Sequence, residues 1–166
     1  ASVDIAWQLG QIDLNDRVRT EACWRFSSML RAGSIVLNVA SLAGFAPLGG
    51  FAVYAASKAY ALNFSVGLAS EWKSRGIKVC ALCPGSVDSE FAKVASAGVR
   101  EKVRHGFSAT TTTRLGLRDA ALGKRISMPR FKWKLNRFAG WLFGPSLSAD
   151  FAYRFMRRPS AYDQPG

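Results

Sequence analysis

Apolar residues recur at two spacings along this chain, and each spacing predicts a different element. Between residues 13 and 30 an apolar residue recurs every fourth position, which predicts a long amphipathic helix. The runs 34–40 and 77–83 are short, apolar and β-branched, as expected for buried strands. Residues 53–74 lie between these runs, are rich in Ala and Leu at helical spacing, and end before a capping Gly76. A right-handed crossover makes the two strands parallel neighbours, with both helices on one face of the sheet.

The pattern is weaker at the two ends of the chain. Residues 1–10 fit either a helix or an irregular entry segment. After Phe91 the pattern becomes indistinct, and the four threonines at 110–113 are poor helix formers. We expect a short helix at 115–123 and a last strand at 124–129. The fold class that follows is α/β.

Charge is concentrated in the second half of the chain. The 166 residues are 49% apolar and 20% charged, an ordinary globular composition, with a formal net charge of +12. Residues 1–99 contain nine Lys and Arg and seven Asp and Glu, whereas residues 100–166 contain fourteen Lys and Arg and four Asp and Glu. Residues 130–143 alternate basic and aromatic side chains and are too short and too charged to span a bilayer. This segment could cap an apolar pocket or lie on an anionic membrane surface. Nucleic-acid binding is the weaker alternative, because no motif supports it.

The cysteines and the histidine give no sign of a metal site. Three cysteines, an odd number, without a secretory leader pattern indicate a reducing compartment and a cytoplasmic location. Cys80 and Cys83 lie within the second predicted strand, where a spacing of three places them on opposite faces. His105 is the only histidine, and we expect a surface side chain rather than a ligand.

Proton-transfer chemistry is indicated by Tyr54 and Lys58, four residues apart on one face of the predicted helix. A phenol has a pKa of about 10, and a nearby cation stabilises the phenolate. Ser41 follows the first strand, at the sheet edge where ligands bind in α/β proteins. The glycine-rich loop 42–52 adds an apolar wall through Phe45, Leu48 and Phe51.

The second strand ends in Pro84-Gly85, which leaves room for a planar ring to approach the backbone. The hydroxyls of Ser86 and Ser89 follow and could hold an amide group.

A strand ending in Ser41, thirteen positions to Tyr54, four more to Lys58 and then a strand ending in Pro84-Gly85 resembles the short-chain dehydrogenase/reductase family. Asn15, Ser41, Tyr54 and Lys58 look like its catalytic tetrad. The sequence PGSVDS is similar to the family's P-G-x-x-x-T motif, with Ser89 in place of threonine.

The resemblance implies a Rossmann-like parallel sheet, an NADP or NAD cofactor with NADP slightly favoured, and an apolar alcohol or carbonyl substrate. Tyr54, Lys58, Pro84, Gly85, Ser86 and Ser89 would contact the cofactor. Helices 13–30 and 53–74 would pair with those of a second subunit. Without the resemblance, Trp24 and Phe26 would most simply be core residues of one chain.

The family's glycine-rich TGxxxGxG turn and NNAG segment do not occur in these 166 residues. We therefore expect a partial doubly wound sheet, with residues 1–123 as the catalytic half and 124–166 as the last strand and a basic aromatic segment. Since the pyrophosphate-binding turn is not in the sequence, we expect no tight binding of NADPH or NADH by this chain alone. The competing hypothesis is a catalytically inactive interaction or dimerisation module.

Overall fold

A three-stranded parallel sheet forms the centre of the protein, in the strand order β1, β2, β5. The computed structural model describes residues 5–95, 98 and 106–156. Strand β1 (Ile35–Val39) pairs along its whole length with β2 (Lys78–Leu82). Strand β5 (Ile126–Ser127) pairs with the carboxyl end of β2. Because β2 is the central strand, its residues from Val79 to Leu82 are all buried. The predicted α/β class and the parallel pairing of the first two strands are confirmed.

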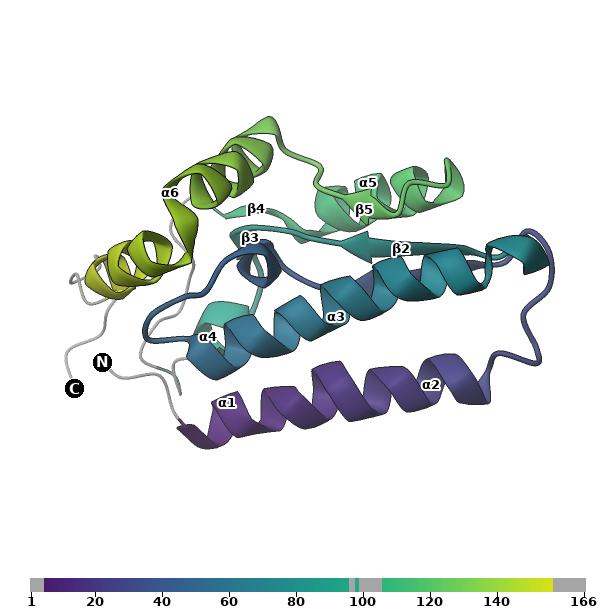
Figure 1. Cartoon of the computed structure of the whole chain (residues 1–166), viewed down its shortest axis with the longest axis horizontal. Helices are drawn as coiled ribbons and strands as arrows, with labels where there is room; N and C mark the ends of the chain where they lie inside the picture. The colour runs from purple at the N-terminus through teal and green to yellow at the C-terminus, as the bar shows by residue number, and fades with distance from the viewer. Residues whose placement is uncertain (1–4, 96–97, 99–105, 157–166) are drawn as a thin grey trace.

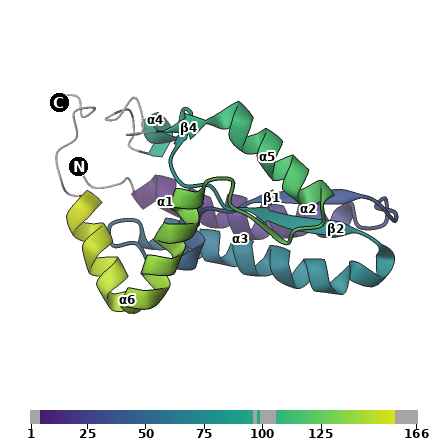
Figure 2. The same ribbon diagram turned by 90° about the horizontal axis from the view of Figure 1, so that it is seen from above.

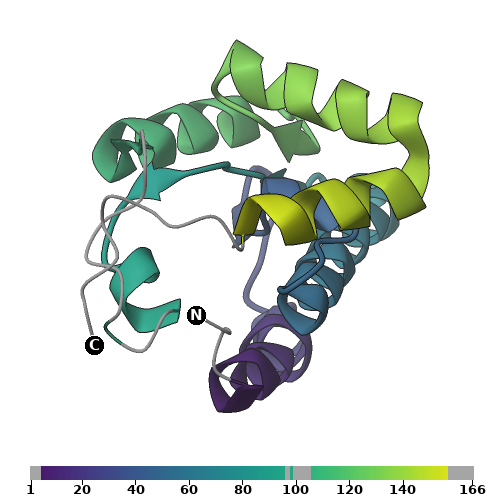
Figure 3. The ribbon, with the colours of Figure 1, turned by 90° about the vertical axis from the view of Figure 1, so that its left-hand side faces the viewer.

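Helices cover both faces of this sheet (Figure 1). Helix α3 (Ala52–Glu71) packs against β1 and β2, and α5 (Ala109–Ala121) packs against the opposite face. The first helical segment lies alongside α3, as Figure 3 also shows, and consists of α1 (Ile5–Ile12), a π-helical stretch Asp13–Val18 and α2 (Arg19–Arg25).

Two buried clusters form the core between α3 and the sheet. One joins Cys23 of α2 to Leu68 and Trp72 from the end of α3, together with Val79 of β2. The other lies nearer the carboxyl ends of the strands and includes Ala61, Leu62, Ala81 and Cys83. The second cluster supports the edge of the sheet where the candidate chemistry lies.

The predicted boundaries of the first helix were wrong at both ends. The helix is already formed at Ile5 and it ends at Arg25, not at Leu30. At its end the Ser27 hydroxyl donates to the Trp24 carbonyl at 2.7 Å, a side-chain bond that competes with further helical bonding. Trp24 and Phe26, predicted as core from the chain alone, are 53% and 57% exposed.

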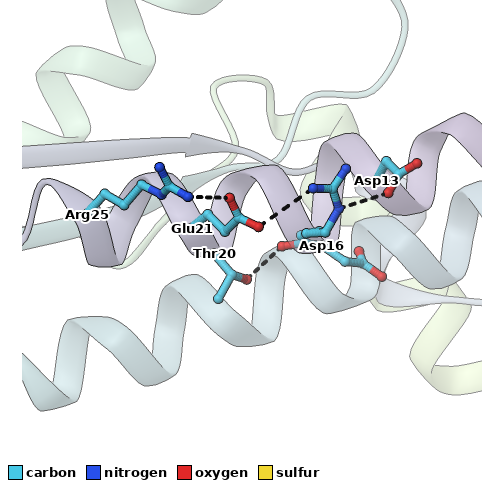
Figure 4. Close-up of polar contacts among 6 residues, drawn as sticks. Asp13, Asp16, Thr20, Glu21 and Arg25 are labelled. Atoms are coloured by element: carbon cyan, nitrogen blue, oxygen red, sulfur yellow. Dashed lines mark hydrogen bonds and ion pairs between the residues drawn. The ribbon is translucent and has the colours of Figure 1, made fainter.

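The outer face of this helical segment carries a ladder of ion pairs (Figure 4). Arg17 contacts Asp13 at 3.1 Å and Glu21 at 3.7 Å, and Arg25 contacts Glu21 at 3.4 Å. These side chains are largely exposed, so each pair contributes only a few tenths of a kcal/mol.

The threonine run lies inside a helix, contrary to the sequence expectation. Helix α5 begins at Ala109, where the Ser108 hydroxyl accepts a bond from the Thr111 amide at 3.3 Å. The Thr112 hydroxyl donates to the Ser108 carbonyl at 2.8 Å, and its side chain is buried. A capping residue and tertiary burial together outweigh the low helix propensity of threonine. Before α5, strand β3 (Val87–Asp88) pairs with β4 (Phe107–Ser108), and α4 spans Phe91–Ala95.

Helix α6 (Phe131–Met156) ends the described chain as two arms joined at a bend, visible in Figures 2 and 3. Gly144 has a φ of 76° and is followed by Pro145, which cannot continue the hydrogen bonding of the first arm. Among the described residues no helix combines the length and the apolar character needed to cross a membrane. The proposed division between residues 123 and 124 remains a prediction.

The three cysteines are free and buried. Within the described ranges, no group of three His, Cys, Asp or Glu side chains could hold a metal ion. His105 lies outside the described residues.

Candidate active site

Ser41 joins the carboxyl ends of β1 and β2. Its hydroxyl accepts a bond from the Ala43 amide at 3.1 Å and donates to the Pro84 carbonyl at 3.4 Å. The Leu42 amide donates to the same carbonyl at 2.8 Å. Both strand ends therefore reach one edge, as the parallel crossover predicted, and the serine side chain is held between them.

A short 3₁₀ turn, Leu42–Phe45, carries the chain from Ser41 toward α3. Gly44 in this turn approaches α3 so closely that a Cβ would lie 2.6 Å from the Lys58 carbonyl oxygen. The absence of a side chain at Gly44 therefore allows the turn to bring Ser41 against the first turns of α3.

Tyr54 lies in the first turn of α3 and is joined to Ser41 by a side-chain hydrogen bond. Two rings flank it: Phe51 at a centroid distance of 6.1 Å and Phe91 at 5.6 Å. Burial among these apolar groups raises the pKa of the Tyr54 phenol, and the hydrogen bond with Ser41 acts in the opposite direction.

Lys58 lies one turn further along α3, and its ammonium is held by oxygen atoms of two other segments. Its ammonium donates to the Asn15 side-chain oxygen at 2.9 Å and to the Val39 carbonyl at 3.3 Å. Burial, followed in size by the positive charge of Arg19, lowers the pKa of Lys58 to about 8, and Cys83 acts in the opposite direction.

The expected lowering of the Tyr54 pKa by Lys58 is therefore not what the structure shows. The Lys58 ammonium lies 5.7 Å from the centroid of the Tyr54 ring and donates its bonds to Asn15 and Val39 instead. Desolvation of the phenol outweighs the hydrogen bond with Ser41, so the pKa of Tyr54 is raised.

Asn15 connects the first helical segment to α3. It is 4% exposed and lies in the π-helical stretch. Its amide donates to the Ser57 hydroxyl at 3.1 Å and to the Gln11 side-chain oxygen at 3.3 Å. With its oxygen facing Lys58, every polar atom of the Asn15 side chain has a partner. The four residues predicted from the resemblance thus form two neighbouring pairs, Ser41 with Tyr54 and Asn15 with Lys58.

Arg19 joins the second of these pairs, although it was not predicted. Its guanidinium donates to the Asn15 side-chain oxygen at 3.1 Å and to the Val39 carbonyl at 3.0 Å. The spacing of four from Asn15 placed Arg19 on the same helix face, and this was the signal available in the sequence.

The residues after β2 lie at the same edge but are less closely connected. Ser86 and Ser89 are exposed, and the Ser89 hydroxyl accepts a bond from the Phe91 amide at 3.4 Å. Gly85 does face a planar ring: a Cβ on it would lie 2.5 Å from the indole nitrogen of Trp133 in α6. The predicted cofactor contacts of Pro84, Gly85, Ser86 and Ser89 remain predictions.

Comparison with known proteins agrees with this arrangement. The model of the short chain dehydrogenase family matches residues 19–100. An uncharacterized short-chain type dehydrogenase/reductase of Sinorhizobium fredii is 32% identical over 143 residues, which are 83% of this chain and 24% of that protein. A very-long-chain 3-oxoacyl-CoA reductase of Anas platyrhynchos is 29% identical over 113 residues, 68% of this chain and 33% of that protein.

The fold is also found among solved structures. A short chain dehydrogenase from Burkholderia cenocepacia in complex with NADP superposes with a TM-score of 0.71 at 18% identity, over 91% of this chain and 61% of that one. The chain therefore spans between 24% and 61% of the length of these proteins. Sequence match, fold and the neighbouring serine, tyrosine and lysine agree, and the chain belongs to the short-chain dehydrogenase/reductase family.

Proposed function

We propose that this chain carries the proton-transfer site of an NAD(P)-dependent oxidoreductase that interconverts an alcohol and a ketone or aldehyde. The observation that carries the proposal is the hydrogen bond between Ser41 and Tyr54 at the carboxyl edge of the sheet, with Lys58 one helical turn away. A hydroxyl and a phenol directed at one point can bind a carbonyl oxygen together.

Each of the four residues has a distinct role in this proposal. Tyr54 gives its proton to the substrate oxygen during reduction and takes one from the alcohol during oxidation. Its raised pKa keeps it protonated at neutral pH, which suits the donor role in reduction. Ser41 holds the substrate oxygen. Lys58 replenishes the proton and binds the ribose next to nicotinamide, and Asn15 fixes the Lys58 ammonium.

The residues present fit the nicotinamide end of a dinucleotide. The Lys58 ammonium has three N–H donors and uses two of them on Asn15 and Val39, which leaves one for a ribose hydroxyl. The exposed Ser86 and Ser89 hydroxyls are available to a carboxamide. When bound, the nicotinamide supplies or accepts the hydride. We favour NADP over NAD, supported by the NADP in the Burkholderia structure.

An apolar, lipid-like substrate is the second part of the proposal. Phe45, Leu48 and Phe51 are half-buried on the loop that precedes Tyr54, and Phe91 lies on the other side of the phenol. Substrate would therefore approach Tyr54 between apolar groups. The similarity to a reductase of very-long-chain 3-oxoacyl-CoA supports the same class of substrate.

Pairing of two copies through the predicted helices is the third part. The first helical segment exposes several large apolar side chains, which a second subunit would cover: Leu9, Ile12, Leu14, Val18, Trp24 and Phe26. Three free, buried cysteines support a cytoplasmic location.

Contact of α6 with an anionic membrane surface is the last part. The sequence left open whether the aromatic rings of α6 turn inward or outward. One ring turns inward and two turn outward: Trp133 is 4% exposed, whereas Trp141 and Phe143 are 74% and 61% exposed. Trp133 thus caps the Gly85 turn, and the outer rings are available to lipid headgroups.

The test of the enzymatic proposal is Tyr54→Phe in the full-length protein, assayed with NADPH and apolar ketones. We expect loss of nearly all turnover with cofactor affinity unchanged, because only the proton donor is lost. Tyr60→Phe is the matched control, since Tyr60 lies on the same helix and its hydroxyl forms a hydrogen bond with Thr20, not with Ser41. Equal turnover of wild type and Tyr54→Phe would instead favour an inactive interaction module.

A further inference from the structure

Arg19 is anchored at the end of β1 by three hydrogen bonds. One of its terminal nitrogens donates to the backbone carbonyl of Asn15 at 2.9 Å, and the other donates to the Asn15 side-chain oxygen at 3.1 Å and the Val39 carbonyl at 3.0 Å. The planar fork of a guanidinium loses little freedom for each bond it forms, so this geometry holds all three acceptors firmly.

Lys58 shares two of these three acceptors. Its ammonium donates to the same Asn15 side-chain oxygen at 2.9 Å and to the same Val39 carbonyl at 3.3 Å. Among the described residues neither cation forms an ion pair with a carboxylate. Two positive charges from different elements therefore meet on two neutral oxygen atoms.

We propose that Arg19 is a positioning residue that turns the Asn15 oxygen and the Val39 carbonyl toward the Lys58 ammonium and holds a second positive charge beside it. This inference rests on the proposed role of Lys58 as a proton carrier. Without Arg19 the Asn15 amide would keep only its bonds to Ser57, Gln11 and Lys58.

The charge on Arg19 adds to the effect of burial on the pKa of Lys58, which lies at about 8. The other titratable groups that face Lys58 are Tyr54 on its own helix and Cys83 at the end of β2, and Cys83 acts in the opposite direction. Arg19 is itself faced by Asp16, Cys23 and Tyr60. A lysine that titrates near neutral pH can exchange protons there, as a relay requires.

The experiment is an NMR titration of this chain labelled with [ε-¹³C]lysine, which follows each lysine through its Cε signal and leaves the ammonium groups unmodified. The Lys58 signal is the one missing in Lys58→Arg. In wild type we expect a pKa near 8, and in Arg19→Gln an upward shift, because the neighbouring positive charge is gone. Arg19→Lys, which retains the charge, should restore the low value.

Arg25→Gln is the matched control, since Arg25 lies on the same helix and pairs only with Glu21 among the described residues. If Arg19→Gln does not fold, Arg19→Met retains the aliphatic stem and replaces it. An ordinary lysine pKa in wild type, or the same Lys58 pKa in wild type and in the Arg19 variant, would overturn the proposal. The titration needs no turnover, so an inactive protein that shows the shift would count against the proposed function alone.

Discussion

The ammonium of Lys58 lies 2.9 Å from the side-chain oxygen of Asn15, although 43 positions separate the two residues. This bond joins α3 to the first helical segment at the edge of the sheet where Ser41 and Tyr54 meet. It satisfies the buried amide of Asn15 and fixes the ammonium of Lys58 at once. Stability and the candidate chemistry therefore depend on the same contact.

Replacing Asn15 should destabilise the fold. Asn15→Ala removes one acceptor from Lys58, one acceptor from Arg19 and the donor to Ser57, so each of these groups loses one hydrogen bond at a largely buried position. We expect the free energy of unfolding to fall by about 1–3 kcal/mol in urea denaturation. Asn63→Ala is the control, because Asn63 is exposed and, in the described part of the chain, its side chain bonds only the Ala59 carbonyl of its own helix. Equal losses in both variants would show that the Asn15 bonds contribute nothing specific.

Replacing Lys58 should change how stability depends on pH. The pKa of Lys58 falls from 10.5 to about 8 on folding, mainly because burial disfavours its charged form. Below pH 8 the Lys58 amine is protonated in both the folded and the unfolded state, and the folded protein bears the full free-energy cost of burying that charge. Between pH 8 and 10.5 the folded state releases the proton before the unfolded state does, so stability rises with pH.

The free energy of unfolding of wild type, measured relative to Lys58→Met, should therefore rise across this window. The total rise is at most about 3 kcal/mol, and less where solvent screens the charge. The comparison with Lys58→Met removes the contribution of the buried thiols of Cys80 and Cys83, which titrate at higher pH in both proteins. A flat difference between pH 8 and 10.5 would contradict the lowered pKa.

The sequence predicted the parallel strands and the position of Ser41, because these features depend on local signals. A β-branched run predicts a buried strand whatever surrounds it, and the right-handed crossover then brings two strand ends to one edge. Tyr54 and Lys58 share a helix face by their spacing alone. These parts of the site needed no knowledge of tertiary contacts.

Other features depend on contacts that no local pattern contains. The sequence placed Lys58 beside the phenol, but its ammonium is directed to Asn15 and Val39, on segments that the helix period does not locate. The sequence pattern indicated for Arg19 only a charged position on an amphipathic helix. Its acceptors on Asn15 and Val39 are known only from the fold. The threonine helix depended on a cap from Ser108 and on burial against the sheet. In each case a contact formed only in the folded protein outweighs the preference that the local sequence indicates.

Gly44 offers a test of how closely the 3₁₀ turn Leu42–Phe45 packs on α3. In Gly44→Ala the new Cβ would meet the carbonyl oxygen and carbon of Lys58 at 2.6 and 2.9 Å, and these backbone atoms cannot move without shifting α3. We expect a loss of about 1–3 kcal/mol in thermal or urea unfolding. Gly67→Ala is the opposite case, since nothing lies within 4 Å of its Cβ position and helix propensity favours alanine by about 0.5–1 kcal/mol. If Gly44→Ala were as stable as wild type, the turn would not pack as described.

The outer face of α6 gives the last prediction. Its two arms expose a row of large apolar side chains: Phe131, Leu135, Phe138, Trp141, Leu142, Phe143, Leu147, Phe151 and Phe155. Basic groups accompany this row. Arg137 and Arg130 stack on Phe45 and Phe107, whereas Lys132, Lys134 and Arg154 are exposed and have no such ring contact among the described residues.

We expect the protein to co-sediment with vesicles that contain anionic lipid, and to be released by high salt. Each lysine contributes about 1 kcal/mol near an anionic surface, so Lys132→Glu combined with Lys134→Glu should weaken partitioning by at least about 30-fold. Trp141→Ala should weaken it through lost ring burial at the headgroups. Trp24→Ala is the control, because this ring is also exposed but lies on α2, away from α6. Vesicle binding could prove independent of salt and of the lysine substitutions, or Trp24→Ala could weaken it as much as Trp141→Ala does. Either result would leave α6 as a cap over the Gly85 turn without a role at the membrane.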